Sequence, residues 1–200
     1  RSSDLVAALA RIEHERGEAA GPASQALERM LEGGGGSSAE RRELAKLLGR
    51  MGGTRFAGAL DPLLDDPDLS VRRLAIASAA DCGRCDLAPR LIEALSEREV
   101  RREAREALAS MGDRIAGLLE EALNDKRRPA RLRYELPRLL RYLGTERAVH
   151  ILLFSNIEDD PFLRHRIAVA LSRMRRAREK LPFDPARTRE ATLRRVDAYL

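Results

Sequence analysis

Apolar residues recur along this chain at helical spacing, inside a segment that is itself repeated. Segments starting at Val71, Val100, Leu132 and Leu163 carry apolar residues at the first position and four, eight and eleven residues beyond it, and a segment starting at Glu40 carries the last three. These spacings place side chains on one face of an α-helix. The last position is filled by Met51, Cys82, Met111, Leu143 and Met174. The pattern predicts five amphipathic helices.

A glycine follows four of these five helices. Gly52, Gly83, Gly112 and Gly144 are spaced by 31, 29 and 32 residues, and Arg175 replaces the glycine in the last copy. Glycine enters the left-handed backbone region without a steric penalty, so it commonly ends a helix. The predicted repeat is therefore about 31 residues long.

A further apolar run of helical spacing precedes the last four of these helices, such as the run from Leu87 to Leu95. Acidic or proline-bearing turns separate the two runs, as in Asp65-Asp66-Pro67-Asp68. Acidic residues and proline are favoured at helix starts. Each unit is thus expected to be a helix, a turn, a second helix and a glycine. The expected fold class is all-α, a right-handed α-α superhelix or α-solenoid.

We expect one domain over residues 1–200, with about five helical pairs in 21–175, an N-terminal helix over 3–16 and a C-terminal helix over 185–200. Ser37 and Glu40 have the spacing of a capping box. Pro62 and Pro137 fall inside predicted helices, where proline removes a hydrogen bond, so kinks or a late helix start near Pro62 are expected.

Composition agrees with thin stacked helices. Aromatic residues make up only 4% of the 200 residues and charged residues 34%, so Leu, Ala, Ile and Val must supply the core. The charge is uneven: residues 1–125 hold 18 Lys and Arg against 23 Asp and Glu, and residues 126–200 hold 19 against 9. Such asymmetry marks either a surface for an anionic partner or a solvated helix face in an Arg-rich protein.

Candidate chemistry is sparse. Cys82-Gly83-Arg84-Cys85 has the spacing of a redox pair or half a zinc site, but Cys82 fills the core position that Met or Leu fills in the other units. The three histidines lack a carboxylate-rich helix face, and no phosphate-binding glycine loop with a lysine appears. We expect no enzyme activity, no cofactor and no metal.

The run Asp66-Pro67-Asp68-Leu69-Ser70-Val71-Arg72-Arg73, followed by Gly83, resembles the short HEAT-like repeats of phycobilisome lyases. The resemblance covers about residues 21–175 and implies a HEAT-like solenoid. In that family the arginine near the start of the second helix pairs with turn acids and forms a ladder along the stack. Asp68, Glu99, Asp125 and Asp160 are the expected acids. The corresponding arginines here are Arg41, Arg72, Arg101, Arg133 and Arg164.

A narrower resemblance begins at Arg131-Leu132-Arg133-Tyr134 and continues through Asp160-Pro161-Phe162-Leu163 to Leu181-Pro182-Phe183-Asp184. These segments are similar to HEAT segments of bacterial major-facilitator proteins related to ATP/ADP translocases. The resemblance implies a cytoplasmic portion of a larger membrane protein, which the start at Arg1 rather than Met also suits. No stretch approaches the roughly 18 apolar residues of a membrane span.

Two binding hypotheses follow. The first is a non-catalytic scaffold whose second helices bind a protein partner or a neighbouring domain, since solenoids present extended surfaces. The second is binding of nucleic acid or an anionic membrane through the basic C-terminal repeats. The basic residues expected to form that surface are Arg127, Arg128, Arg131, Arg138, Arg141, Arg173, Arg175 and Arg176.

Overall fold

The computed structural model describes residues 37–51, 59–155 and 160–177. The described part of the chain is all-α and contains no β-strand. The predicted helices over 3–16 and 185–200 lie outside the described residues, as does Gly52.

The described helices follow the predicted alternation. The second helices of the five units are α3 (Ser38–Met51), α5 (Leu69–Asp81), α7 (Arg101–Met111), the pair α9 (Ala130–Arg133) and α10 (Leu136–Leu143), and α12 (Pro161–Ala177). The first helices are α4 (Leu60–Leu64), α6 (Ala88–Ala94), α8 (Ala116–Asn124) and α11 (Glu146–Phe154). Short 3-10 turns, η2 (Cys85–Leu87) and η3 (Gly112–Ile115), precede α6 and α8.

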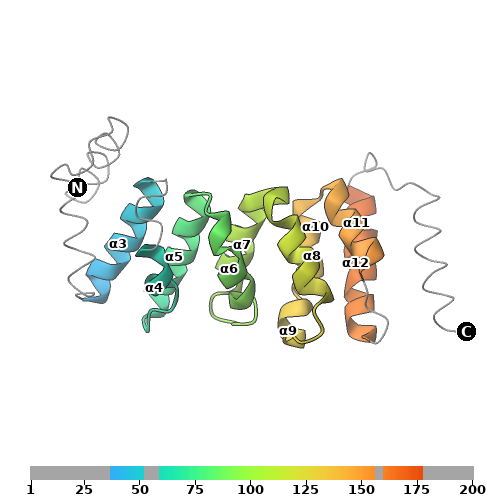
Figure 1. The fold of residues 1–200 in the computed structure, drawn as a ribbon, viewed down its shortest axis with the longest axis horizontal. Helices are drawn as coiled ribbons and strands as arrows, with labels where there is room; N and C mark the ends of the chain where they lie inside the picture. Colours follow the sequence, from blue (N-terminus) through green and yellow to red (C-terminus); the bar gives the residue numbers. More distant parts are fainter. Residues whose placement is uncertain (1–36, 52–58, 156–159, 178–200) are drawn as a thin grey trace, which may run out of the picture.

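The helices stand side by side in one elongated row (Figure 1). Consecutive second helices pack on each other, α3 on α5, α5 on α7, α7 on α10 and α10 on α12. Among the first helices, α6 packs on α8 and α8 on α11. The row therefore has two layers, and the main helix–helix contacts of the described residues are between neighbouring units.

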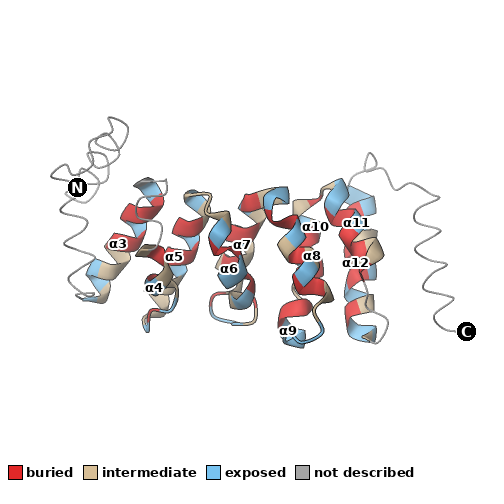
Figure 2. Ribbon diagram, viewed as in Figure 1, coloured by how far each residue is buried: buried red, intermediate tan, exposed pale blue. Residues whose placement is uncertain are grey.

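The core is one cluster of buried apolar side chains that continues along the row (Figure 2). The first position of the apolar pattern is buried at Val71, Val100, Leu132 and Leu163. The position four residues beyond it is buried in all five second helices. Eleven residues beyond that first position, Met111 and Met174 are buried, while Cys82 and Leu143 are partly buried against the cluster. The helical spacing read from the sequence thus identifies the core face.

Local side-chain caps fix where several helices begin. The predicted capping box is confirmed, since the backbone N–H of Ser37 donates to Glu40 Oε2 at 2.7 Å and the N–H of Glu40 donates to Ser37 Oγ at 3.4 Å. Asp68 caps α5 by accepting from the N–H of Ser70 at 2.8 Å. Asp160 accepts from the N–H of Leu163 at 3.0 Å, next to Pro161 at the start of α12. These caps satisfy N–H groups that have no partner within the helix.

Both interior prolines mark helix starts. Pro62 is the third residue of α4, which begins at Leu60. Pro137 lies in the first turn of α10 and has no N–H to offer the carbonyl of Arg133, where α9 ends. The expected kink in the fourth unit is thus a break between two short helices.

Glycines end three of the second helices. Gly83, Gly112 and Gly144 have φ values of 63°, 62° and 60°, as predicted for helix-ending glycines. Gly144 is left-handed helical with ψ 29°, whereas Gly112 has ψ −147°, a region that only glycine populates readily. The chain therefore turns at Gly112 in a way that a Cβ atom opposes.

Helices α3 and α5 approach closely where both carry a small residue. A Cβ placed on Gly49 would lie 2.7 Å from Ser78 Oγ and 3.0 Å from Ser78 Cα. The Ser78 hydroxyl is buried and donates to the carbonyl of Ala45 at 2.6 Å. Close backbone contact and this hydrogen bond hold the first two units together.

Candidate functional site

The arginine near the start of α3 and of α5 reaches forward along the row. On α3, Arg41 Nε and Nη2 donate to the two carboxylate oxygens of Asp66 at 2.6 and 3.1 Å. On α5, Arg72 Nη1 donates to Glu97 Oε2 at 2.7 Å. Both carboxylates belong to the turn of the following unit, so each ion pair joins two units.

The same position in the later units combines ion pairs with bonds to backbone carbonyls. Arg101 donates to the carbonyls of Leu95 and Ser96 at 2.7 and 3.0 Å and lies 3.6 Å from Glu135. Arg133 is buried, donates to the carbonyl of Leu123 at 3.1 Å, and lies 3.7 Å from Asp160. Arg164 occupies the equivalent position on α12, and its backbone N–H bonds the carbonyl of Asp160 at 3.0 Å.

Three of the four acids expected as partners have other contacts. Asp68 caps its own helix, Asp125 pairs with Arg127 and Arg128, and Glu99 offers its backbone carbonyl to Arg73 at 2.9 Å. The hydrogen-bonded carboxylates of Arg41 and Arg72 are Asp66 and Glu97 instead, and the charge of Asp68 acts on Arg41 in addition. The spacing could not show this, because neighbouring turn residues point in different directions once the turn folds.

The charge on the second helices changes along the row. Helices α3, α5 and α7 carry acidic residues among their arginines, such as Glu103, which lies 3.4 Å from Arg73, and Glu106, which lies 3.0 Å from Arg102. Helices α10 and α12 contain no Asp or Glu. The last two units consequently present arginines that have no carboxylate on their own helix.

Arg127, Arg128 and Arg131 lie before or within α9, and they differ in their partners. Arg127 is 92% exposed and lies 3.1 Å from Asp125. Arg128 forms a close ion pair with Glu93 on α6, in the layer of first helices. Arg131 is exposed, and no carboxylate among the described residues lies within ion-pair distance of it. Only Arg131 of these three offers a free positive charge.

Arg138 and Arg141 lie on α10 close to the ring of Tyr142. Their guanidinium carbons are 5.9 and 4.7 Å from the centre of its ring. A hydrogen bond from Arg138 and the positive charges of Arg138 and Arg141 hold the pKa of the Tyr142 hydroxyl below its usual value, against a smaller opposing effect of burial. Tyr142 is 53% exposed, so this cluster combines positive charge with an accessible ring.

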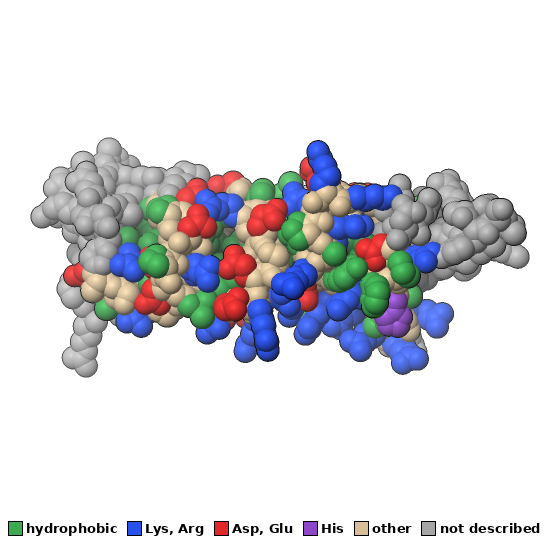
Figure 3. All heavy atoms as spheres, turned by 90° about the horizontal axis from the view of Figure 1, so that it is seen from below, with side chains coloured by type: hydrophobic (Ala, Val, Ile, Leu, Met, Phe, Trp, Pro, Cys, Tyr) green, Lys and Arg blue, Asp and Glu red, His purple; other side chains and the backbone are tan. Residues whose placement is uncertain are grey.

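Arg173, Arg175 and Arg176 are exposed at the end of α12, far along the helix from its start at Pro161. Seen from the edge where the second helices begin, Lys and Arg side chains gather along the lower border from the middle of the molecule to its right-hand end (Figure 3). Just before α9, Arg127 forms an ion pair with Asp125 and Arg128 forms one with Glu93. We call Arg138 and Arg141 of α10 and Arg173 of α12 the α10–α12 surface; Arg138 and Arg173 are exposed, and Arg141 is half-buried.

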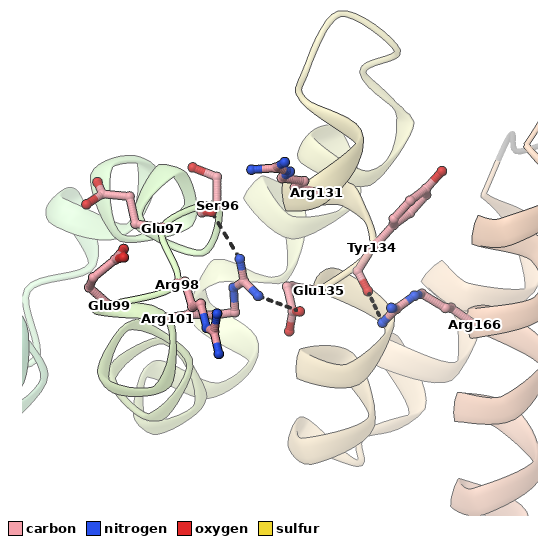
Figure 4. A pocket seen from close by; sticks show the side chains of 9 residues that line it. All are labelled: Ser96, Glu97, Arg98, Glu99, Arg101, Arg131, Tyr134, Glu135 and Arg166. Carbon is pink, nitrogen blue, oxygen red and sulfur yellow. Dashed lines mark hydrogen bonds and ion pairs between the residues drawn. The ribbon is translucent and has the colours of Figure 1, made fainter.

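A pocket of about 580 Å³ opens at the edge where the second helices begin. Its wall combines the turn after α6, including Arg98 and Glu99, with Arg131 of α9, Glu135 before α10 and Arg166 of α12. Arg98, Arg131 and Arg166 stand around one open space, with Arg101 and Glu135 between them (Figure 4). Arg166 donates to the carbonyl of Tyr134 at 3.2 Å and lies 5.6 Å from the centre of its ring.

The cysteines and histidines form no site in the described part of the chain. The Cys82 thiol lies 3.0 Å from the carbonyl oxygen of Leu48, so it packs on α3, and neither cysteine forms a disulfide among the described residues. His150 stacks on Phe154 with ring centres 4.5 Å apart, and His165 is exposed. No group of three potential metal ligands occurs among the described residues.

Several residues of these surfaces escaped the sequence reasoning. Tyr142 follows Arg138 by four residues, a helical spacing that could have indicated the cluster. Phe162 is 71% exposed, and its ring centre lies 6.3 Å from that of Tyr134. Arg98 lies in a turn without periodicity, so no sequence signal identifies it.

None of the described helices is both long and apolar enough to cross a membrane. Compared with known proteins, the chain matches no protein-family model, and no curated protein is significantly similar to it.

Proposed function

We propose that this chain is a HEAT-like α-solenoid, a right-handed α-α superhelix that acts as a non-catalytic binding module. The two-layered row of helical pairs and the ion pairs between successive units support this proposal. The resemblance to transporter-linked HEAT segments favours a cytoplasmic part of a larger membrane protein. Its partner is a protein or a neighbouring domain of the same chain.

The observation that carries the proposal is the charge of the α10–α12 surface. Neither helix has an acidic residue, while Arg138, Arg141 and Arg173 are solvent-accessible. Arginine suits an interface because its planar fork pairs bidentately with carboxylates and its loss of hydration is modest. The accessible ring of Tyr142 adds apolar contact area at the same place. The surface therefore fits an acidic protein segment.

Binding of a fluorescent acidic peptide, measured by anisotropy across a salt series, tests this function. We expect binding that weakens with salt, and the double substitution Arg138→Ala, Arg141→Ala to lower affinity about tenfold, which is about 1.4 kcal/mol. The matched control is Arg73→Ala, Arg102→Ala, which removes the same charge from α5 and α7, where Glu103 and Glu106 are ion-paired to these arginines. Equal losses in the two variants contradict the proposed location.

The second candidate is a nucleic acid, favoured by the exposed Tyr142 ring near the guanidinium groups of Arg138 and Arg141. Stacking on aromatic rings beside arginines is the usual way of binding single strands. A single-stranded oligonucleotide of mixed sequence and vesicles containing phosphatidylserine serve as competitors in the same assay. Tighter binding of the oligonucleotide, lost on Tyr142→Ala, replaces the acidic-protein proposal with the nucleic-acid one.

A further inference from the structure

The pocket between the third, fourth and fifth units holds more positive charge than its own carboxylates neutralise. Glu135 accepts from Arg105 at 2.9 Å and lies 3.6 Å from Arg101. Glu97 accepts from Arg72 at 2.7 Å. The structure thus satisfies two of the three carboxylates in the wall with arginines of neighbouring helices.

The arginines facing the open space have no such partners. Arg98 and Arg131 have no carboxylate within ion-pair distance among the described residues. Arg166 uses one nitrogen for the carbonyl of Tyr134, a neutral acceptor, so its charge is not balanced. Glu99 is the one carboxylate of the wall without an ion pair in the described chain. Three guanidinium groups against one carboxylate leave an excess of two positive charges.

A second pocket, of about 240 Å³, shows what a balanced site looks like in this fold. It lies between α4, α5 and α6 on a floor that includes Ile76 and Leu91. Its Arg90 forms a close ion pair with Asp65, and its Arg72 pairs with Glu97. Arginines at unit junctions are ordinarily neutralised here, so the unpaired set at the larger pocket is a distinct feature.

We propose that the larger pocket binds a phosphomonoester group through Arg98, Arg131 and Arg166. A phosphomonoester carries nearly two negative charges at neutral pH and presents three acceptor oxygens. A carboxylate pairs with one guanidinium bidentately and leaves the other two unmatched. A phosphodiester has one charge and two free oxygens. The three guanidinium groups, which come from a turn and from two helices, match the phosphomonoester in charge and in number of acceptors.

The pocket is also large enough to hold the group that carries the phosphate. Its volume lies within the range of about 300 to 1,000 Å³ typical of small-molecule sites. The phosphate can therefore belong to a small metabolite or to a phosphorylated side chain of a protein. The lining of this pocket includes none of Arg138, Arg141 and Arg173, and the proposal does not depend on the function proposed above.

Isothermal titration of the full chain with phenyl phosphate tests the site. We expect binding whose affinity rises from pH 5 to pH 7.5, because the second proton of the phosphate leaves near pH 6. Arg98→Ala and Arg131→Ala, both at exposed positions, are expected to weaken binding about tenfold each, as the loss of a charge-assisted hydrogen bond implies. Circular dichroism establishes that these variants are folded.

The control variant is Arg127→Ala, which removes an exposed arginine near the pocket that is paired with Asp125. It should bind phenyl phosphate as the unsubstituted protein does, and so should the Arg138→Ala, Arg141→Ala protein. Dimethyl phosphate, a phosphodiester, should bind at least about tenfold more weakly because one charge and one acceptor are missing. A phosphoserine peptide distinguishes the two possible sources of the phosphate. If the peptide binds more tightly than phenyl phosphate, the ligand is a phosphorylated protein; if it binds more weakly, the ligand is a small molecule.

Absence of phenyl phosphate binding at millimolar concentration overturns the proposal. So does binding that Arg98→Ala and Arg131→Ala leave unchanged, or equal affinity for dimethyl phosphate. None of these results bears on the acidic-peptide assay, because that assay depends on Arg138 and Arg141.

Discussion

At the scale of single residues, Gly112 shows how one backbone angle ends a helix and begins the next unit. Its φ of 62° with ψ of −147° lies where a Cβ atom collides with the backbone. Apart from Gly112 itself and its two chain neighbours, no atom lies within 4 Å of a Cβ built there. The requirement for glycine is therefore conformational and does not come from crowding.

We expect Gly112→Ala to lower the free energy of unfolding by about 1–3 kcal/mol, the cost of holding a non-glycine residue in such a region. Urea unfolding followed by circular dichroism measures it. Ser110→Ala is the control, since the Ser110 hydroxyl only bonds the carbonyl of Ala107 in its own helix. An unchanged midpoint for Gly112→Ala would show that the chain does not adopt this angle in solution.

At the scale of elements, the Arg41–Asp66 ion pair ties α3 to the turn that precedes α5. Burial by itself raises the pKa of Asp66, but hydrogen bonds from Arg41 and from the N–H of Asp68, with the charge of Arg41, hold it below its usual value near 3.8. The native state thus binds the Asp66 proton more weakly than the unfolded chain. Its stabilising contribution is fully present above about pH 4 and is lost as the pH falls through the native pKa.

Asp66→Asn should therefore be less stable than the unsubstituted protein at pH 7 and should lose less stability on acidification from pH 5 to pH 3. Urea midpoints at the three pH values give the comparison. Asp81→Asn, at an exposed position on α5, should keep the full acid sensitivity. If Asp66→Asn and the unsubstituted protein respond to acid alike, the ion pair does not link the first two units.

At the scale of the whole molecule, the row of helices limits how far a perturbation spreads. Helix α3 packs on α4 and α5, whereas α10 packs on α7, α11 and α12. In an array whose units contact only their neighbours, stability is close to a sum of unit and interface contributions. Loss of the α3–α5 contact should accordingly loosen the first units and spare the last.

Gly49→Ala tests this locality. The added methyl group would lie 2.8 Å from Ser78 Cβ, so the helices must separate, and we expect a loss of about 1–3 kcal/mol that exceeds the gain of about 1 kcal/mol in helix propensity. Hydrogen exchange should rise in α3 and α5 and stay unchanged in α10 and α12.

The control for this substitution is Gly117→Ala on α8. The nearest atom to a Cβ there is Arg147 Nη2 at 3.6 Å, an ordinary contact, so the change should be neutral or stabilising. Faster exchange in all helices of Gly49→Ala would contradict the expected locality.

The sequence alone determined the features that depend on residues close together in the chain. Apolar spacing identified the buried face at Leu44, Ala75 and Ile167, glycines marked helix ends at Gly83 and Gly144, and Ser37 with Glu40 predicted a cap that the structure contains. Each of these follows from contacts within one helix or its adjoining turn. Proline at position 137 likewise signalled a disturbed helix, although only the structure showed a complete break.

Tertiary packing decided which charges pair and which remain free. Arg41 hydrogen-bonds Asp66, and Arg128 forms an ion pair with Glu93 on another helix. Arg131 lines a pocket with Arg98 and Arg166 and has no carboxylate partner among the described residues. The partners in each ion pair are separated by 25 or more residues, and side-chain direction within a turn selects among neighbouring acids. The repeating unit and the basic residues of α10 and α12 could therefore be predicted from the sequence, whereas the arginine-lined pocket depends on which arginines the packing pairs with carboxylates.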